Sequence, residues 1–463
     1  MNYEEAISFL KDTEQYGSRL GLDSIRHLMR VLGDIQEEIP IVHIAGTNGK
    51  GSVGAMLSSV LTESGYRVGR FNTPDVFSYE EEFLMNGVPI ERARLARLFT
   101  EVSQACERMV KRKLPHPTRF EVESAAAFLW FYQEECDIAL VEVGMGGETD
   151  ATNLITKPLV SVLTSISMDH MKFLGETISE ITAAKAGIIK PGCPVVSVPQ
   201  KPEAWEIIRE KCRSEHAALF PADENLAENV SSSGKISFLW DMSVFDDGMN
   251  GMTDAADPKS VCTDTAGKTT EPDRCKNSPY HRITLGLRGH FQLENAVCAL
   301  HVLALLKPEY PQINSFTVVS GLGNTCWPGR FEQIGSSPDI YIDGAHNEDA
   351  ALKLRVSLDE YFPNRRILYI MGVLADKEYE KMIRIMFHEG DRVYTLTPPN
   401  ARALSADDLA MRLKRQKIDA VSCANPRDAV SYALADAEET DVILAFGSLS
   451  YLSAVREAFG NIG

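Results

Sequence analysis

The sequence predicts an α/β protein whose mainly parallel sheets are flanked by helices. Short apolar runs rich in β-branched residues, typical of buried parallel strands, recur along the chain. Stretches with helical spacing of apolar residues alternate with these runs, which is the pattern of α/β folds. A length of 463 residues further predicts two or three domains.

The composition is that of an ordinary globular protein, with 44% hydrophobic and 24% charged residues. A formal net charge of −18 makes nucleic acid and anionic membranes poor partners. No apolar run reaches the ~18 residues that span a bilayer, and the N-terminus lacks a signal-peptide pattern. Nine dispersed cysteines without a C-x-x-C pair fit a reducing compartment, so we expect a cytoplasmic protein.

The earliest predicted strand, residues 41–45, leads directly into a glycine-rich turn. Residues 46–52 read Gly-Thr-Asn-Gly-Lys-Gly-Ser, and helical spacing of apolar residues follows them. Glycines let backbone N–H groups approach an anion closely, and the N-terminus of a helix adds a favourable dipole. We therefore expect a phosphate-binding loop in which Lys50 reaches the outer phosphates and Ser52 ligates Mg²⁺.

The loop departs from the strict phosphate-loop pattern at two positions. Ile44 stands where that pattern has its first glycine, and Gly51 separates the lysine from the serine. With Ala45 included, the string Ala-Gly-Thr-Asn-Gly-Lys-Gly-Ser resembles the nucleotide loop of the Mur ligase superfamily. Within that superfamily it is most similar to the folylpolyglutamate synthase/dihydrofolate synthase family. The resemblance implies contacts to ATP from Gly46, Thr47, Asn48, Gly49, Lys50, Gly51 and Ser52.

The segment before the loop, residues 4–32, has helical spacing that glycines interrupt. Residues 21–25 resemble the family's N-terminal stretch, which lines a pterin pocket. A Phe-Glu pair that opens a later apolar helix resembles the family's pair beside the pterin. The resemblance therefore implies acceptor contacts from Leu22, Ile25, Phe120 and Glu121.

A second strand, residues 67–71, runs into a polar, proline-containing segment, residues 72–83, which is expected to be a loop. It resembles the family's Ω-loop. Thr73 stands where the family usually has serine and keeps the hydroxyl, so the resemblance implies a metal contact. Asp75 and Glu82 stand where the family has histidine and arginine, which makes this loop unusually acidic.

Candidate ligands follow two further strands. Residues 137–143 form a predicted strand with Glu142 near its carboxyl end, where ligands of parallel sheets bind, so Glu142 is a Mg²⁺ candidate. A strand over 159–164 precedes His170, which falls where the family places a metal-binding histidine. Asp150 opens an Asp-Ala-Thr-Asn string that matches the family's substrate loop, which implies an acceptor contact.

A second strong string, residues 184–192, contains the predicted end of a helix at Gly187. It resembles the superfamily segment in which a lysine is carbamylated into an anionic group that orients the metal. The resemblance implies this modification for Lys185. After a strand at 194–198 the composition changes, and residues 222–280 predict a flexible insertion.

Order returns with an apolar run at 283–287 and a helix that begins at Asn295. The resemblance implies that Asn295 contacts the nucleotide. A Trp-Pro-Gly-Arg string at 327–330 follows, and Arg330 offers a planar, always-charged fork for the γ-phosphate.

The rest of the chain again alternates strands and helices, with strands expected at 339–342, 365–373, 392–397 and 442–446. The resemblance implies that Asp343 closes over the nucleotide and that His346 and Ser448 lie near an incoming glutamate. We predict a Mur-ligase-type ATP-binding domain over residues 1–325 and a smaller Rossmann-like domain over residues 326–463.

These strings occur in the family's order and imply an ATP-dependent ligase of folate biosynthesis and one-carbon metabolism. An acceptor carboxylate would take the γ-phosphate as an acyl phosphate, and the amine of L-glutamate would displace that phosphate. The implied acceptors are tetrahydrofolate and dihydropteroate, and the implied cofactors are ATP and Mg²⁺, with K⁺ as a further candidate ion. The expected catalytic residues are Lys50, Lys185 and His346. We expect a monomer.

Two other functions remain open. One is another Mur-type ligase, which would add an amino acid to a peptidoglycan nucleotide. Such enzymes usually carry an additional N-terminal domain, for which the ~45 residues before the phosphate loop leave little room. The other is a non-catalytic nucleotide-binding regulator, against which the intact set of metal candidates speaks.

Overall fold

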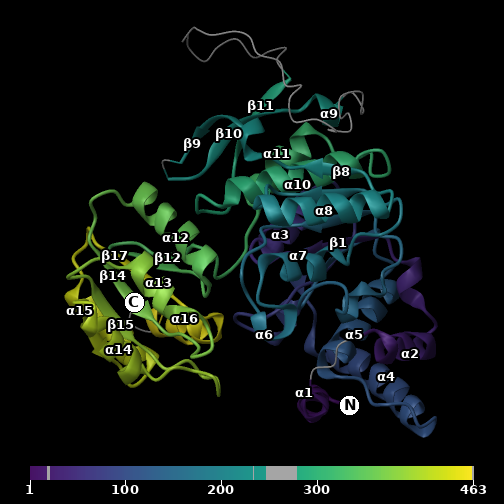
Figure 1. Ribbon diagram of the computed structural model, residues 1–463, viewed down its shortest axis with the longest axis horizontal. Coiled ribbons are helices and arrows are strands. Elements are labelled where there is room, and N and C mark those ends of the chain that lie inside the picture. Colours follow the sequence, from purple (N-terminus) through teal and green to yellow (C-terminus); the bar gives the residue numbers. More distant parts are fainter. Residues whose placement is uncertain (18–20, 233, 247–278, 461–463) are drawn as a thin grey trace.

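The computed structural model describes residues 1–17, 21–232, 234–246 and 279–460. Figure 1 shows two α/β units side by side, the N-terminal one in purple to green and the C-terminal one in green to yellow. The eight-stranded sheet of the N-terminal unit has the order β4-β3-β2-β5-β1-β6-β7-β8. Its strands are β1 (Ile41–Ala45), β2 (Val68–Phe71), β3 (Phe83–Met85), β4 (Val88–Pro89), β5 (Ile138–Glu142), β6 (Val160–Leu163), β7 (Val195–Ser197) and β8 (Leu219–Pro221).

Strand β1 lies in the middle of this sheet and pairs in parallel with both β5 and β6. All five of its residues are buried, as expected for a parallel strand covered on both faces. Alternate side chains enter different cores, so Val42 and Ile44 pack on one face of the sheet and Ile41 packs on the other. Only β3 and β4, at one edge, run antiparallel to their neighbours.

Helices cover both faces of the sheet. One core joins it to α1 (Tyr3–Thr13), α2 (Asp23–Leu32), α4 (Arg92–Lys111) and α5 (Arg119–Gln133). Another joins it to α3 (Lys50–Glu63), α10 (Gln292–Leu306) and α11 (Ser315–Asn324). A third, smaller core includes α7 (Ile178–Ala186) and α8 (Pro202–Ser214). A short helix, α6 (Met171–Leu174), precedes α7.

The segment predicted as a flexible insertion contains regular structure in its described residues. Strands β9 (Glu228–Ser231), β10 (Ser237–Asp241) and β11 (Tyr280–Thr284) form an antiparallel sheet, and α9 (Ser243–Asp246) follows β10. Phe238 and Ile283 are buried in the core that holds α3 and α10. The polar composition of this segment comes from the exposed side of the sheet, so it gave no sign of the apolar side that packs on the core. The remainder of the predicted insertion, residue 233 and residues 247–278, lies outside the described residues.

The C-terminal unit is a doubly wound sheet with the order β12-β13-β17-β14-β15-β16. Its strands are β12 (Glu332–Gly335), β13 (Asp339–Ile342), β14 (Ile367–Met371), β15 (Arg392–Thr395), β16 (Asp419–Ser422) and β17 (Val442–Phe446), of which β12 alone is antiparallel. One core contains α12 (Glu348–Tyr361), α13 (Tyr379–Met386) and α14 (Ala406–Arg415). The opposite core contains α15 (Pro426–Asp436) and α16 (Leu452–Gly460).

The predicted α/β class, with a mainly parallel N-terminal sheet and a separate C-terminal sheet unit, is confirmed. The boundary at residues 325 and 326 stays our proposal, and it falls between α11 and β12. The predicted helix over residues 4–32 is two helices, α1 and α2, with a 3₁₀ turn at Glu14–Tyr16 after the first. The remaining 3₁₀ turns are Ile35–Glu38, Tyr79–Glu82, Ala151–Leu154, Glu224–Leu226 and Leu449–Tyr451.

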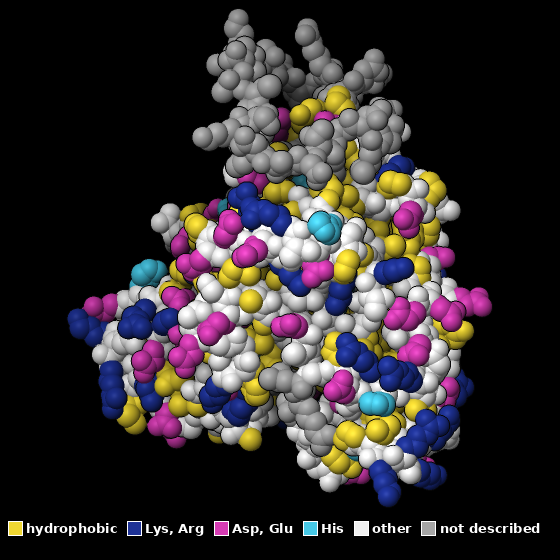
Figure 2. Space-filling model, turned by 45° about the vertical axis from the view of Figure 1, so that its right-hand side comes forward, with side chains coloured by type: hydrophobic (Ala, Val, Ile, Leu, Met, Phe, Trp, Pro, Cys, Tyr) yellow, Lys and Arg dark blue, Asp and Glu magenta, His cyan; other side chains and the backbone are white. Residues whose placement is uncertain are grey.

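None of the helices in the described ranges combines the length and apolar character that crossing a bilayer requires. On the face shown in Figure 2, acidic side chains are interspersed with basic ones over both units.

Candidate active site

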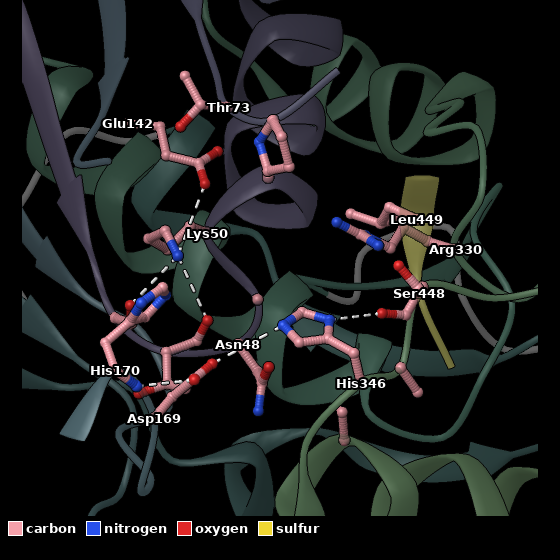
Figure 3. A pocket seen from close by; sticks show the side chains of 18 of the residues that line it. Asn48, Lys50, Thr73, Glu142, Asp169, His170, Arg330, His346, Ser448 and Leu449 are labelled. Atoms are coloured by element: carbon pink, nitrogen blue, oxygen red, sulfur yellow. Dashed lines mark hydrogen bonds and ion pairs between the residues drawn. The ribbon is translucent and has the colours of Figure 1, made fainter. Parts of the chain in front are cut away.

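A cavity of about 600 Å³ lies between the two units, where the carboxyl ends of both sheets meet. The N-terminal unit lines it with residues at or after the ends of β1, β2, β5 and β6, namely 46–52, 73–76, 142–146 and 169–170, and with Lys185 of α7. The C-terminal unit adds residues that follow β13, β14, β15 and β17, among them Asp343, His346, Lys377, Arg402 and Ser448. Figure 3 shows side chains from both units turned toward this space.

The phosphate loop predicted at 46–52 forms the wall of the cavity that joins β1 to α3. Gly46 and Gly49 have positive φ angles of 156° and 93°, which favour glycine. A Cβ at Gly46 would lie 1.8 Å from Thr164 Oγ1, and a Cβ at Gly49 would lie 2.4 Å from Asn295 Oδ1. The loop therefore follows a path that other residues would block, with the first turn of α3 at its end.

Lys50, the first residue of α3, points back over this loop (Figure 3). Its Nζ donates to the carbonyl oxygens of Gly46 at 3.2 Å and Thr47 at 3.3 Å, and lies 3.6 Å from Glu142 Oε1. The ammonium group is thus held at the mouth of the loop, where an anion bound to the backbone N–H groups would meet it.

Glu142 and His170 lie on either side of Lys50 (Figure 3). Burial raises the pKa of Glu142, an effect that the charges of Lys50, Arg70 and Arg330 oppose. Burial lowers the pKa of His170 to about 4, so its imidazole is neutral at pH 7 and retains a free lone pair. Both groups are therefore electron-pair donors in a cation-rich part of the cavity.

The two hydroxyls predicted as metal ligands also line the cavity: Ser52 from α3 and Thr73 from the loop after β2. Ser52 is buried, and its Oγ accepts a hydrogen bond from Gln292 Nε2 at 3.3 Å. Within the part of the chain that the structure describes, no three His, Cys, Asp or Glu side chains gather as a complete metal site. The predicted set therefore depends on hydroxyl oxygens as well as on Glu142 and His170.

Lys185 is buried at the end of α7 and lines the same cavity. Its Nζ donates to the carbonyl oxygen of Gly46 at 2.8 Å, so it shares that acceptor with Lys50. Burial and the charge of Lys50 lower the pKa of Lys185 to about 7. Burial therefore favours the neutral amine of Lys185 over its ammonium form.

Arg330 and Asp343 come from the C-terminal unit, where Asp343 is buried and Arg330 is partly buried. The Asp343 carboxylate accepts hydrogen bonds from the backbone N–H groups of Phe331 and Ala345, each at 2.7 Å. Gly344 leaves room for the guanidinium, because a Cβ there would lie 1.8 Å from Arg330 Nη1. Asp343, predicted to contact the nucleotide, thus also holds the backbone that presents Arg330.

Sequence reasoning missed Asp169 and Lys377, which join the two units beside His346. Lys377 Nζ donates to Asp169 Oδ1, and Asp169 Oδ2 lies 3.7 Å from His346 Nε2. Although burial opposes it, the side chains of His346 and Lys377 hold the pKa of Asp169 well below its usual range. Both missed residues follow parallel strands, β6 and β14, so the strand-end rule that selected Glu142 could have found them.

Asn48 also connects the units. Its Nδ2 donates to Asp349 Oδ2 at 2.8 Å and to Asn347 Oδ1 at 3.2 Å, while Asn347 Nδ2 donates back to Asn48 Oδ1 at 3.1 Å. Asn347 is the N-cap of α12, so the start of that helix sits directly on the phosphate loop. Asn295 lies on the other side of the loop, and its Nδ2 donates to Gln292 Oε1 at 2.9 Å.

The predicted acceptor residues are placed differently, since Leu22, Ile25, Phe120, Glu121 and Asp150 do not belong to the cavity lining. Ile25 is buried in the core with α4 and α5. The Glu121 carboxylate accepts from the Thr118 N–H at 2.7 Å and closes a capping box on α5. Their contact with an acceptor stays a prediction.

Asp150 and Phe120 shape the loop that follows β5, the strand that ends at Glu142. Asp150 accepts from the Met145 N–H at 2.8 Å and from Thr152 Oγ1 at 2.6 Å. Phe120 packs on Gly144, where a Cβ would lie 2.5 Å from its Cζ. Of the residues expected near glutamate, His346 and Ser448 do line the cavity.

Of the two acidic departures noted in the Ω-loop, Asp75 is exposed, whereas Glu82 belongs to a buried cluster with α5. Glu123 Oε1 accepts from Tyr79 Oη at 3.0 Å and from Arg119 Nε at 2.8 Å. Glu82 is buried beside it, and its Oε2 has no hydrogen-bond partner in the described residues. Burial raises the pKa of both carboxyl groups, and the charge of Glu123 raises that of Glu82 further.

We expect Glu82→Gln to stabilise the protein at pH 8 and to leave it unchanged near pH 4. The raised pKa means that the folded state keeps a proton on Glu82 that the unfolded state releases above its ordinary pKa of about 4.3. The contribution of this proton to the free energy of unfolding is complete below about pH 4.3 and decreases as the pH rises above it. The glutamine side chain of the variant does not titrate, so the variant does not undergo this decrease. Thermal unfolding should show a Tm higher by about 2 °C at pH 8. The exposed Glu107→Gln is the control, and a lower Tm at pH 8 would contradict the protonated state.

Comparison with known proteins agrees with this geometry. The family model described as Mur ligase middle domain matches residues 44–303, and the model described as Mur ligase, glutamate ligase domain matches residues 329–449. The chain is 33% identical to the dihydrofolate synthase/folylpolyglutamate synthase of Bacillus subtilis, with 98% of each chain covered. It is 31% identical to the folylpolyglutamate synthase of Lacticaseibacillus casei, with 99% of this chain and 98% of that one covered.

Solved structures give the same result. The apo form of L. casei FPGS superposes with a TM-score of 0.79 at 27% identity and complete coverage of both chains. An FPGS–AMPPCP–folate complex superposes with a TM-score of 0.77 at 28% identity, covering 99% of this chain and 100% of that one.

Proposed function

The chain belongs to the folylpolyglutamate synthase/dihydrofolate synthase family of Mur ligases, and from this premise we propose that its interdomain cavity joins L-glutamate to a folate-type acceptor. It is an ATP-dependent ligase. The acceptor carboxylate attacks the γ-phosphorus of ATP, which gives an acyl phosphate and ADP. The amine of L-glutamate then attacks the acyl carbon, so that an amide forms, phosphate leaves and the amine loses a proton. The observation that carries this proposal is the convergence of a phosphate loop and charged strand-end residues of the second unit on one cavity.

Lys50 and Arg330 neutralise the phosphates in this proposal. Phosphoryl transfer depends on positioning and on charge stabilisation, and a cavity shielded from water strengthens both. Lys50 is already aligned over the loop, and Arg330 enters from the opposite unit (Figure 3). The Asn48–Asn347 contact keeps the two walls together, so closure of the units would exclude water that hydrolyses an acyl phosphate.

Glu142, His170, Ser52 and Thr73 would hold Mg²⁺. The donors fit such an ion because three of the four are oxygens, which Mg²⁺ prefers, and substrate phosphates and water complete its shell. Glu142 also has a buried carboxylate whose ion pair with Lys50 is long, at 3.6 Å. Bound Mg²⁺ would offset the charge of the transferring phosphate.

Lys185 would act as a carbamate. Its ammonium first loses a proton, and the neutral amine then adds CO₂ and loses a second one, so that a cation is replaced by an anion. The pKa near 7 supports this reaction, because the amine is available at physiological pH. An anionic side chain would also relieve the repulsion between Lys185 and Lys50 at the shared Gly46 carbonyl.

The glutamate would bind against the C-terminal unit, near His346 and Ser448. L-Glutamate brings two carboxylates, and the cavity wall offers Lys377 and Arg402 in addition to His346. Since planar Arg and compact Lys groups both bind carboxylates, we assign these two residues to the amino-acid substrate.

We expect Lys377→Met to raise the KM for L-glutamate at least about 10-fold and to change the KM for ATP less than about 3-fold. A charge-assisted hydrogen bond contributes roughly 1.5–3 kcal/mol, which corresponds to this range. Steady-state ADP release measures both constants. Lys381→Met on the neighbouring helix α13 is the matched control. An unchanged glutamate KM together with a raised ATP KM would assign Lys377 to the nucleotide instead.

The function itself is tested by ADP release with different acceptors. Tetrahydrofolate and dihydropteroate are each supplied with ATP and L-glutamate, and a muramoyl-peptide nucleotide serves as the comparison. Release that requires both a pterin-type acceptor and glutamate is the expected result, and turnover with dihydropteroate assigns the dihydrofolate synthase activity as well. Nucleotide binding without turnover would favour a regulator. We also propose a cytoplasmic monomer, on the dispersed free cysteines and the net charge of −18.

A further inference from the structure

A buried arginine lies beneath the phosphate loop. Arg70 is on β2 and is buried, and its Nη2 donates to the carbonyl oxygen of Gly51 at 2.8 Å. Although burial lowers the pKa of Arg70 to about 10, the group stays charged at neutral pH. The negative charge of Glu142 opposes this shift, and among the described residues it is the one side-chain charge that affects the pKa of Arg70. A permanent buried cation is costly unless its partners compensate it, so its surroundings are informative.

The guanidinium of Arg70 stacks on Trp327, with Cζ 4.0 Å from the ring centroid. A desolvated cation–π contact of this kind is among the stronger ones. Two glycines in the first turns of α3 make room for the pair. A Cβ at Gly51 would lie 2.8 Å from Trp327 Nε1, and a Cβ at Gly54 would lie 3.2 Å from Arg70 Nε. Gly51 is the residue that separates Lys50 from Ser52.

Trp327 is not part of either sheet. It lies between α11 and β12, in the segment that passes from one unit to the other. Arg330 follows it by three residues and enters the cavity. The stacked pair therefore connects three parts of the molecule: strand β2, the phosphate loop at Gly51, and the segment that leads from Trp327 to Arg330.

We propose that Arg70 and Trp327 form a brace that sets the position of Arg330 relative to the phosphate loop, which makes Arg70 a positioning residue for phosphoryl transfer. Neither side chain lines the cavity, so the brace acts through Gly51 and through the backbone that leads to Arg330. The kinetic test of this inference rests on the proposed function. A second test measures nucleotide binding and does not require turnover.

The alternative is that Arg70 acts only as a charge that offsets Glu142. The two explanations differ for conservative variants. Arg70→Lys keeps the charge but loses the planar group that stacks and donates at the same time. Trp327→Phe keeps an aromatic face and loses an indole N–H that has no partner in the described residues.

The experiment compares Arg70→Met, Arg70→Lys, Trp327→Leu, Trp327→Phe and the double variant Arg70→Met/Trp327→Leu. We expect kcat to fall at least about 10-fold in Arg70→Met, Arg70→Lys and Trp327→Leu, with the KM for L-glutamate within about 3-fold of wild type. The kcat of the double variant should be no lower than that of either single variant, because each substitution already breaks the same Arg70–Trp327 contact. Trp327→Phe should stay within about 3-fold of wild type.

Isothermal titration with AMPPCP supplies the second readout, on variants whose circular dichroism matches wild type. Each disruptive single variant should weaken nucleotide binding at least about 5-fold, and the double variant no further. Wild-type turnover in Arg70→Lys, or losses that multiply in the double variant, would overturn the brace. If the wild-type chain binds AMPPCP without ligating any acceptor, the proposed function fails, and the titration still decides whether the brace exists.

Discussion

Lys50→Met should reduce ligation about 10³-fold or more, mainly through kcat. The substitution removes the ammonium that two loop carbonyls hold over the phosphate site, in a buried setting where charge is poorly screened. Loss of one preorganised group that stabilises developing charge typically costs 10²–10³-fold in kcat, and an outer-phosphate lysine lies at the upper end of this range. ADP release under saturating ATP, acceptor and L-glutamate measures the effect.

The exposed Lys11→Met on α1 is the control for this variant and should match wild type. The variant should remain folded, since Lys50 contacts the loop only through two carbonyl oxygens, and that of Gly46 also accepts from Lys185. A kcat within about 5-fold of wild type would show that the loop does not carry the γ-phosphate, and the proposed mechanism would fail at its first step.

Lys185→Ala should abolish ligation, with kcat lower by at least about 10²-fold, and added bicarbonate should not restore it. The alanine cannot add CO₂, so the anionic group that is proposed to orient the metal is lost. In the wild-type protein, ¹³C-labelled bicarbonate should give a carbamate resonance that Lys185→Ala lacks. Because the pKa of Lys185 is about 7, the neutral amine prevails above that value and the ammonium below it. The resonance should therefore weaken as the pH falls from 8 to 6.

The exposed Lys201→Ala serves as the matched control for the labelling and for turnover. Full activity in Lys185→Ala would rule out the carbamate role. A lost resonance with retained activity would show that the modification forms without taking part in catalysis.

The long buried strands were predictable because their residues face apolar layers on both sides. Strands β1 and β5 have this pattern; β1 ends directly before Gly46 of the loop, and β5 ends at Glu142. The edge strands β4 and β8, and β3 next to β4, were not predictable in the same way. Strand β4 has two exposed residues, and β3 and β8 have three residues each, so they offer too few positions for a pattern. Their pairing depends on neighbours that are distant in sequence.

The candidate site divides along similar lines. The loop at 46–52 and Glu142 were predicted from a glycine-rich turn and a strand end, whereas the roles predicted for His170 and Lys185 came from the resemblance of their local strings to the family. Asp150 and Glu121 carried equally local strings, yet the structure uses their carboxylates to hold backbone N–H groups. A short sequence motif therefore predicts where a residue lies in the fold more securely than it predicts which group the side chain contacts.

By itself the sequence determined the α/β class, the glycine turn between β1 and α3, and the family, since all three depend on residues that are neighbours along the chain. Only the tertiary structure decided which distant residues meet between the units. The contact of Asp169 with Lys377, of Asn48 with Asn347 and of Arg70 with Trp327 each joins residues more than 200 positions apart. Such pairs leave no periodic signal, because their geometry is set by the packing of two separate sheets whose carboxyl edges face one another.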